Sequence, residues 1–552
     1  MTFDPSWTPS VPGPWMQDRS HNPAPNTQLA QDIYPAGFNR GFEETCSRYG
    51  TLLDRLAMST VNGFTYHQPQ PFDMPGPNGP LTPEQLGAEF GRRTDVAAQV
   101  FADRMWNDDL RLWDTELKPA SVRKHMELNA VTLDSLTDAG LRFHIERCAA
   151  HLEEMVYQHH RFNLSAMVPV GDFLLQVSGW TSMAPTALFD ALGGASPVSG
   201  LVPTELAAAV AAVKRDPEAE RIARRDGDAA GRLAALCATV PEMADYMDRT
   251  GYRLVDGFDV TRPTVGECPE LVMGKLAAAL DVDPAEATRR AVAFAAEIRL
   301  LVASEHQSEF DALLHEARTV YRLRDERGIY SEVSAFGLMR LAMLELGRRL
   351  GNRGRLEDPT EVLDASFGEL LAMIDGDLSP TSSVLSARAT ERNELTRSGA
   401  PRFLGPPMPE PPPVDQLPPP MARMMSAVGL MIDGILGELA EPSGDHSVIR
   451  GIPVGHSTYE GRAHVVHNFE DLFTLEAGDV LVTPSTGEAF NAMIHLVGAI
   501  VTDHGSFACH AAIMARELGF PAVVGTTNGS RRIPHGARVR VDGRSGEVTV
   551  LA

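Results

Sequence analysis

The position best suited to covalent phosphoryl chemistry is His510. It follows an apolar stretch at 499–502 and a loop with Gly505 and Ser506, and it opens a helical pattern that stops at Gly519. The order predicts a strand, a loop and a helix with His510 in its first turn. The free N–H groups and positive end of a helix stabilise an anion and favour a neutral, nucleophilic imidazole. Histidine can carry a phosphoryl group covalently, although by spacing alone it is as readily a cap or a packed side chain.

Two further histidine positions could act as a general base toward a substrate hydroxyl. His21 lies three residues after Asp18 on a proline-rich loop, which makes a histidine–carboxylate pair. His160 ends a long helical pattern and is the second candidate. A general base that works near pH 7 is most often histidine, so we predict catalytic roles for His21, Asp18 and His160.

A stripe on the predicted helix at 142–162 offers an alternative that involves a metal. His144, Cys148, His151 and Met155 recur at steps of four, three and four residues, so they share one face. Such spacing can hold a metal ion, but a stripe of this kind more often lines a core. The sequence therefore predicts no metal site on this chain.

The elements that position these residues fall into three predicted domains. Residues 401–420 form a proline-dense tract, which cannot continue a helix and favours an extended spacer. The chain before the tract is mostly helical in pattern. From about 447 short strands follow, separated by glycine and aspartate turns, with two helices predicted between them at about 486–496 and 508–518. We therefore predict a helical domain at 1–400, a proline-rich linker and hinge helix at 401–445, and a C-terminal α/β domain at 446–552.

Composition narrows the functional classes. The 552 residues carry a formal net charge of −24 with no concentrated basic patch, which disfavours nucleic acid and anionic membranes as partners. The five cysteines are scattered, as suits a reducing compartment. The N-terminus shows no signal-peptide pattern and no apolar run is long enough to span a bilayer, so we expect a cytoplasmic protein.

A long run around His510 resembles a known family. The stretch Val501–Gly525 reads VTDHGSFACHAAIMARELGFPAVVG, and it resembles the swivelling phosphohistidine domain of phosphoenolpyruvate-utilising enzymes. The resemblance implies that His510 is the phosphorylated histidine. It also places the phosphate-binding groups in the same run, with Ser506 where the family prefers a second glycine; these groups are Gly505, Ser506, Cys509 and Arg516.

Looser patterns extend the resemblance toward the N-terminus. Residues 15–25, 157–162 and 321–327 resemble the acceptor-binding domain of the rifampicin phosphotransferase and phenylphosphate synthase group. The resemblance implies that 1–400 holds a hydroxylated small organic acceptor. On this basis we expect the acceptor to be contacted by His159, Arg324 and Arg327.

The resemblance also implies a partner. No glycine-rich phosphate loop of the P-loop or dinucleotide type occurs in the sequence. The domain set is similar to the α-type subunit of phenylphosphate synthase, so the implied donor is ATP with Mg²⁺ on a separate ATP-grasp nucleotide-binding protein. Two other hypotheses stay open: a non-catalytic scaffold or regulator that keeps the fold, and a phosphorelay carrier fed from phosphoenolpyruvate.

Overall fold

The computed structural model describes residues 6–19, 21–74, 79–200, 202–408, 410–437, 448–467, 470–487, 490 and 493–551. The chain forms two compact units, each assembled from separate stretches of sequence. Unit 1 combines Met1–Ser165, Tyr252–Thr264 and Glu326–Met425, and unit 2 combines Ala166–Gly251, Val265–Asp325 and Ser426–Ala552. The three-domain division expected from the sequence runs in simple chain order and stays a prediction.

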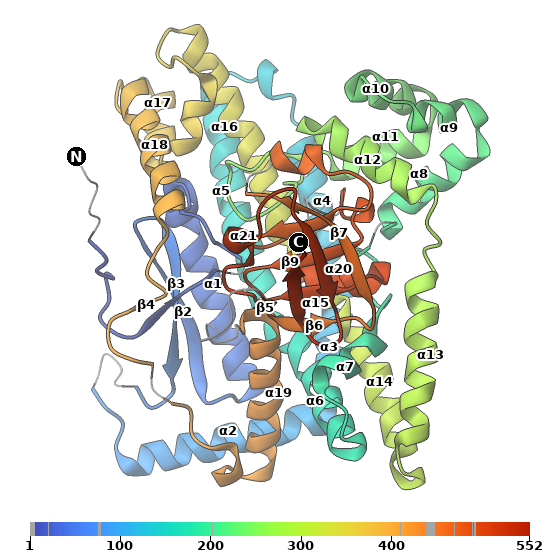
Figure 1. Cartoon of the computed structure of the whole chain (residues 1–552). Helices are drawn as coiled ribbons and strands as arrows, with labels where there is room; N and C mark the ends of the chain where they lie inside the picture. Colours follow the sequence, from blue (N-terminus) through green and yellow to red (C-terminus); the bar gives the residue numbers. More distant parts are fainter. Residues whose placement is uncertain are drawn as a thin grey trace. The chain divides into compact units, whose positions relative to one another are not determined.

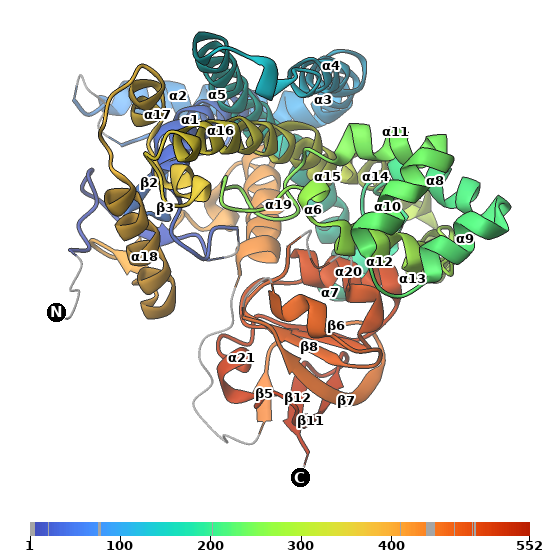
Figure 2. The ribbon, with the colours of Figure 1, turned by 90° about the horizontal axis from the view of Figure 1, so that it is seen from above.

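Unit 1 is a layer of helices beside a small sheet (Figures 1 and 2). Several of its helical segments follow one another without a break, and two of these segments are π-helical turns, η1 and η6. The helical elements are α1 (Gln28–Tyr49), α2 (Pro83–Asp103), α3 (Met105–Leu112), η1 (Trp113–Leu117), α4 (Lys118–Asn129), η2 (Leu133–Ser135), α5 (Asp138–Arg161), η6 (Ile329–Val333), α16 (Ser334–Asn352), η7 (Pro359–Asp364), α17 (Phe367–Ile374), α18 (Ser382–Ser398) and η8 (Val414–Gln416). Helices α15 (Leu323–Gly328) and α19 (Pro419–Leu436) are each divided between the two units.

Helices α1, α5 and α16 pack side by side around the main core of this unit. Glycines on α1 allow the close approach to α5. A Cβ atom built on Gly37 would lie 2.5 Å from the carbonyl oxygen of Glu153, and one on Gly41 would lie 2.8 Å from that of Tyr157. These distances are shorter than van der Waals contact, so only glycine fits. The close packing brings the middle of α1 against the end of α5.

A four-stranded antiparallel sheet in unit 1 was not predicted from the sequence. Its order is β2-β3-β1-β4, with β1 Trp15–Gln17, β2 Leu53–Val61, β3 Phe64–Pro71 and β4 Phe403–Leu404. Strand β4 lies in the predicted proline-rich linker and pairs with β1. The start of the linker is therefore part of the unit 1 sheet.

The helical part of unit 2 contains a second core. Alanine-rich helices pack on one another here, with small side chains inward and charged ones outward. The helical elements are α6 (Asn163–Thr181), α7 (Pro185–Leu188), η3 (Phe189–Leu192), α8 (Thr204–Arg215), α9 (Pro217–Arg224), α10 (Ala229–Thr239), α11 (Pro241–Thr250), η4 (Val265–Glu267), α12 (Pro269–Ala279), α13 (Glu286–Leu301), η5 (Ser304–His306) and α14 (Gln307–Tyr321).

The C-terminal part of unit 2 is an α/β domain built on an eight-stranded sheet, drawn in orange to red in Figure 2. The order is β5-β12-β11-β7-β8-β9-β10-β6, and β7, β8, β9 and β10 run parallel. The elements are β5 (Val448–Arg450), β6 (Ile452–Val454), β7 (Thr458–Val465), η9 (Glu470–Thr474), β8 (Val480–Thr483), η11 (Ile494–Leu496), β9 (Ala499–Thr502), α20 (His510–Leu518), β10 (Ala522–Val524), α21 (Gly529–Arg532), β11 (Arg538–Asp542) and β12 (Glu547–Val550).

The predicted fold class, a mostly helical region followed by a C-terminal α/β domain, is confirmed. The predicted helix at 508–518 corresponds to α20. The predicted helix at 486–496 falls partly on 488–489 and 491–492, which lie outside the described residues, and its described end is the short 3₁₀ turn η11. Among the described residues, none of the helices combines the length and the apolar character needed to cross a bilayer.

Candidate functional site

The first candidate site is the connection from β9 to α20. Strand β9 is buried along its whole length, and the chain leaves it through a loop that Asp503 holds in place. The carboxylate of Asp503 accepts hydrogen bonds from the backbone N–H of Ser530, at 2.7 Å, and from the Ser530 hydroxyl. The helix then begins at His510 and ends at Gly519, which adopts the left-handed conformation with φ 79°. His510 is therefore the first residue of α20, which places it in the first turn as predicted, although the helix begins two residues later than position 508.

Gly505 is required by the shape of this loop. Its φ is +101°, a conformation that residues with a side chain rarely adopt. A Cβ atom at this position would lie 2.8 Å from both Cβ and Sγ of Cys509. The loop can therefore reach the start of α20 only with glycine here. Ser506, the departure from the family pattern, is 3% exposed and its carbonyl accepts from the Cys509 N–H at 3.0 Å.

The imidazole of His510 is held in its neutral form. Burial lowers the pKa of His510 to about 4, and the positive charge of Arg324 acts in the same direction. Its Nδ1 lies 2.9 Å from the hydroxyl oxygen of Thr486, so one ring nitrogen is fixed by a hydrogen bond. The sequence resembles the family at 481–486 but gives Thr486 no role at His510, because it lies 24 residues away and meets His510 only once β8 and β9 are paired.

Arg324 approaches His510 from the end of the helical part of unit 2. Its Nη1 is buried and makes no hydrogen bond among the described residues, although Asp325 lies 3.5 Å from it. A buried guanidinium N–H without a partner is costly, and an anion would satisfy it. The structure thus places Arg324 at the phosphohistidine candidate. Its predicted contact with the acceptor stays a prediction.

Arg516 makes contacts other than those expected of a phosphate-binding group. Its Nε lies 2.5 Å from a carboxylate oxygen of Asp190, Nη1 donates to the carbonyl of Phe507 at 2.5 Å, and Nη2 donates to the carbonyl of Thr186 at 3.2 Å. The guanidinium also lies over the ring of Phe189. In this arrangement Arg516 joins the α/β domain to the helical part of unit 2. Its role toward phosphate stays a prediction.

Further contacts hold α20 against the same helices. The carboxylate of Glu517 accepts from the Gly194 N–H at 2.8 Å, and Arg290 donates to the carbonyl of Glu517 at 2.8 Å. The rings of Phe189 and Phe507 meet edge to face with centroids 5.5 Å apart. Residues at or next to both ends of α20 therefore contact the helical part of unit 2.

The second candidate site lies in unit 1, where Asp18 and His21 form the predicted pair. Nδ1 and the backbone N–H of His21 lie 3.2 and 3.0 Å from the same carboxylate oxygen of Asp18. Burial raises the pKa of Asp18. The charge and hydrogen bonds of His21 and the charge of His67 lower this pKa by more than burial raises it, so the net shift is downward. Asp18 is therefore ionised, and the side chain of His21 remains half exposed. The catalytic role of the pair stays a prediction.

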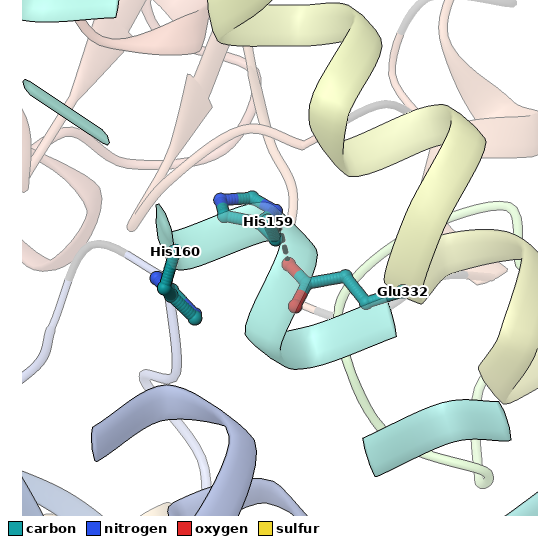
Figure 3. Close-up of side chains that lie close together, drawn as sticks. All are labelled: His159, His160 and Glu332. Atoms are coloured by element: carbon teal, nitrogen blue, oxygen red, sulfur yellow. Dashed lines mark ion pairs between the residues drawn. The ribbon is translucent and has the colours of Figure 1, made fainter. Parts of the chain in front are cut away.

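His159 and His160 meet a glutamate that the sequence did not single out. Nδ1 of His159 lies 2.8 Å from Oε1 of Glu332, which is carried by the π-helical turn η6 (Figure 3). The hydroxyl of Tyr34, from α1, donates to Oε2 of Glu332 at 3.1 Å and lies 3.2 Å from Nε2 of His160. Three segments far apart in the sequence thus place four polar groups together.

Burial dominates the electrostatics of this cluster. It lowers the pKa values of His159 and His160 well below the ordinary range, with help from the charge of Arg327. It also raises the pKa of Glu332 to about 8, and burial together with the charge of Glu332 raises that of Tyr34. All four side chains are therefore biased toward their neutral forms.

Arg327 supports the cluster from behind. Its Nη1 donates to the carbonyl of His159 at 2.9 Å and to the side-chain oxygen of Asn163, whose amide nitrogen in turn lies 3.3 Å from Nδ1 of His160. Arg324 and Arg327 were predicted as one acceptor-binding pair. They lie in different units, Arg324 with His510 and Arg327 with His159.

The stripe of histidine, cysteine and methionine side chains on α5 lines the core of unit 1. His144, Cys148, His151 and Met155 are all buried. The Sγ atom of Cys148 lies 3.4 Å from Nε2 of His144, and the rings of His151 and His125 have centroids 4.9 Å apart. Of the described residues, only His159, His160 and Glu332 meet the geometric requirement for a three-residue metal group.

Comparison with protein families identifies two segments of the chain. Residues 475–546 match the family described as PEP-utilising enzyme, mobile domain, and residues 168–325 match the rifampicin phosphotransferase fourth domain. The first segment contains His510, and the second coincides with the helical part of unit 2, including Arg324. The chain therefore carries a PEP-utilising mobile domain, which confirms the resemblance found in the sequence.

Curated relatives agree with this assignment. The rifampicin phosphotransferase of Streptomyces sviceus is 29% identical over 56% of this chain and 34% of its own length. That of Bacillus subtilis is 26% identical over 61% of this chain and 37% of its own length. The chondramide synthase of Chondromyces crocatus is 30% identical over 62% of this chain but only 9% of its own length. The chain thus spans about a third of the phosphotransferases it matches.

Among solved structures, a solution structure of Enzyme I matches 45% of this chain and 65% of its own length, with 18% sequence identity and a TM-score of 0.14.

Proposed function

We propose that this chain is a phosphotransferase component in which His510 carries a phosphoryl group to a hydroxylated small organic acceptor bound by unit 1. The observation that carries the proposal is the position of His510. It begins α20 inside the segment that matches a PEP-utilising mobile domain, and the positive charge of the buried Arg324 side chain acts on it. The rifampicin phosphotransferase relatives support the same class of reaction.

In the first step, the lone pair of His510 Nε2 attacks phosphorus while the bond from phosphorus to the donor oxygen breaks. We assign the new bond to Nε2 because Nδ1 is hydrogen-bonded to Thr486. A neutral ring is required for attack, and the low pKa of His510 supplies it at neutral pH. The helix N-terminus and Arg324 then balance the charge of the bound phosphoryl group.

In the second step, the acceptor oxygen attacks phosphorus and the bond to Nε2 breaks. The hydroxyl proton must pass to a base in unit 1, for which His21 with Asp18, or His160, are the proposed groups. His159 and Arg327 are proposed to orient the acceptor. Since phosphoryl transfer needs positioning and charge balance more than covalent chemistry, the acceptor site can vary while the carrier remains the same.

The proposed donor is ATP with Mg²⁺ bound to an ATP-grasp protein. A carrier that loads in one place and unloads in another must move between them, and such motions often limit turnover. The mobile-domain match of residues 475–546 supports this proposal. Phosphoenolpyruvate is the alternative donor and is distinguished by the same experiment.

The test is transfer of label to His510. The full chain is incubated with Mg²⁺, the ATP-grasp protein encoded nearest to it and ATP labelled at both the β and γ phosphates. We expect label that is acid-labile and base-stable, lost in His510→Gln and kept in His504→Gln, a matched histidine of the same loop. Label that survives His510→Gln, or no label with either donor, contradicts the proposal. If His510 is labelled from phosphoenolpyruvate and not from ATP, phosphoenolpyruvate is the donor.

A further inference from the structure

The cluster at the end of α5 contains two buried polar atoms that make no hydrogen bond among the described residues. Glu332 is completely buried, and its Oε1 has no hydrogen-bond partner among the described residues. Nδ1 of His159 is likewise buried and without such a partner. The two atoms form an ion pair at 2.8 Å but no hydrogen bond with one another. Buried polar atoms without partners are costly and usually indicate an unseen group.

The spacing of the donor atoms fits a shared metal ion. One ligand atom each from His159, His160 and Glu332 lies within 4.8 Å of the other two (Figure 3). Zinc binds imidazole nitrogen and carboxylate oxygen at about 2.0–2.2 Å, so two ligands of one ion lie about 3 Å apart. The separation of Nδ1 and Oε1 is close to this value, and the ligand atom of His160, which lies within 4.8 Å of both, must move closer.

The donor set selects the class of cation. Two imidazoles and one carboxylate suit Zn²⁺, Fe²⁺, Co²⁺ or Mn²⁺, whereas Mg²⁺ and Ca²⁺ prefer oxygen ligands. The charge of Arg327, which lies against His159, also opposes ions that are held mainly by charge.

The surrounding groups resemble the outer shell of a metal site. Tyr34 donates to Oε2 of Glu332, which leaves Oε1 as the coordinating oxygen. The two ring nitrogens of His160 face Tyr34 and Asn163, so metal binding exchanges one of these two contacts for coordination. Arg327 fixes the backbone of His159 and the side chain of Asn163 together. Such outer contacts orient ligands and set metal affinity.

We propose that His159, His160 and Glu332 bind one divalent cation of the Zn²⁺ class, with a coordination position open to an oxygen ligand. Resting on the proposed function, that ligand is the hydroxyl of the acceptor, whose proton affinity the cation lowers before transfer. Three protein ligands with an open position are typical of catalytic rather than structural zinc sites. Tyr34, Asn163 and Arg327 act as positioning residues. Since His160 is here a ligand, the hydroxyl proton passes to His21 with Asp18.

The test measures metal binding directly on the full chain. After removal of metals by chelation, the protein is titrated with Co²⁺, which gives visible absorption bands when bound by nitrogen and oxygen ligands, and with Zn²⁺ by calorimetry. We expect one ion per chain, displacement of Co²⁺ by Zn²⁺ and no competition from Mg²⁺. Absence of stoichiometric binding at micromolar Zn²⁺ overturns the inference.

Variants locate the ion. Glu332→Gln and His159→Gln each remove one ligand and are expected to weaken Zn²⁺ binding at least tenfold. The matched control is His151→Gln, which removes another buried histidine of α5 and should leave binding unchanged. Equal weakening in the control, or none in the ligand variants, overturns the inference.

Two readouts keep the test decisive. Zn²⁺ should raise the melting temperature of the wild-type chain and of His151→Gln but not of the ligand variants, so a variant with lowered stability still gives an answer. Label on His510 is measured in the same preparations. Metal binding without label contradicts the proposed function alone, and label without metal binding contradicts this inference alone.

Discussion

His510 in unit 2 and the pair His159 and His160 in unit 1 are all kept as neutral imidazoles, yet different polar groups lie beside them. Burial lowers the pKa in each case, to about 4 for His510. Around His510 the nearby groups are a helix N-terminus and Arg324, which favour an anion. Around His159 and His160 an arginine, Arg327, also acts, but the carboxyl group of Glu332 lies against His159 and can accept a proton or bind a cation.

The difference shows that the protonation state of a histidine does not define its chemistry. A neutral ring beside donors is suited to carry a phosphoryl group, and a neutral ring beside acceptors is suited to bind a metal or take a proton. The two sites also differ in how they are built. His510 belongs to a single strand–loop–helix connection. The cluster of His159, His160 and Glu332 forms only when α1, α5 and η6 pack together.

The largest effect is expected from removing the positive charge beside His510, which should alter labelling at that site and leave the unit 1 cluster unchanged. Arg324→Gln removes the cation beside His510, and the rate of His510 labelling should fall about 100-fold, as for loss of one preorganised charge-stabilising donor. Arg531→Gln, an exposed arginine of α21, is the control and should label normally. Metal binding in unit 1 should not change in either variant. An unaltered labelling rate in Arg324→Gln would remove Arg324 from the site.

The next largest effect is expected from Gly37→Ala, which should destabilise unit 1 without affecting His510. Gly37→Ala places a Cβ atom 2.5 Å from the backbone of α5, so α1 must move away, and we expect a loss of about 2 kcal/mol in unfolding free energy. Gly87→Ala in α2 meets no atom within 4 Å and should stabilise by about 0.5–1 kcal/mol, since alanine favours a helix. Denaturant unfolding measures both. Retained His510 labelling in the folded Gly37→Ala protein is part of the expectation.

A smaller effect concerns pH. With a pKa of about 4, His510 is almost entirely neutral at pH 6, whereas an ordinary histidine would be mostly protonated, which amounts to an about fourfold difference in the reactive form. The initial labelling rate, with donor loading kept saturating, should therefore be flat from pH 8 to pH 5.5. In Arg324→Gln the pKa should rise and the rate should begin to fall at higher pH. A wild-type rate that halves near pH 6.5 would contradict the assignment.

The smallest effect lies at the contact between the α/β domain and η3. His456 Nε2 lies 3.1 Å from Asp190, and this hydrogen bond raises the pKa of His456. A raised pKa in the folded state means that the pair stabilises fully below the ordinary value of 6.5 and is lost as the pH rises through the folded value. Because His456 is 68% exposed, we expect only about 0.5 kcal/mol. Thermal unfolding of His456→Gln should match the wild type at pH 9 and fall below it at pH 6.

The His510 site could be predicted because its parts are adjacent in sequence. The strand, the loop and the helix start occur within one run, and local rules are enough to order them. The pairing with Thr486 and the approach of Arg324 required the folded sheet and the neighbouring helices. Strand β6 was missed because Pro453 interrupts its pattern, and its place at the sheet edge is where a proline is tolerated.

The unit 1 cluster could not be predicted in the same way. Glu332 lies in an ordinary helical pattern, and nothing local marks it as the partner of residues 170 or more positions earlier. The hairpin of β2 and β3 did carry a signal that was overlooked. Asn62 and Gly63, with φ values of 51° and 80°, form the two-residue turn that an Asn-Gly pair favours between strands.

The position of Glu332 in the cluster depends on the number of residues in the π-helical turn η6. Such a turn contains one residue more than an α-helical turn, so Ile329–Val333 holds Glu332 in a register that a regular helix would not allow. Deleting one residue between Gly328 and Ser334 would restore the regular helix and rotate Glu332 by about 100° away from His159. Homologous chains that lack this residue should therefore have lost the carboxylate from the cluster, even where a glutamate still aligns.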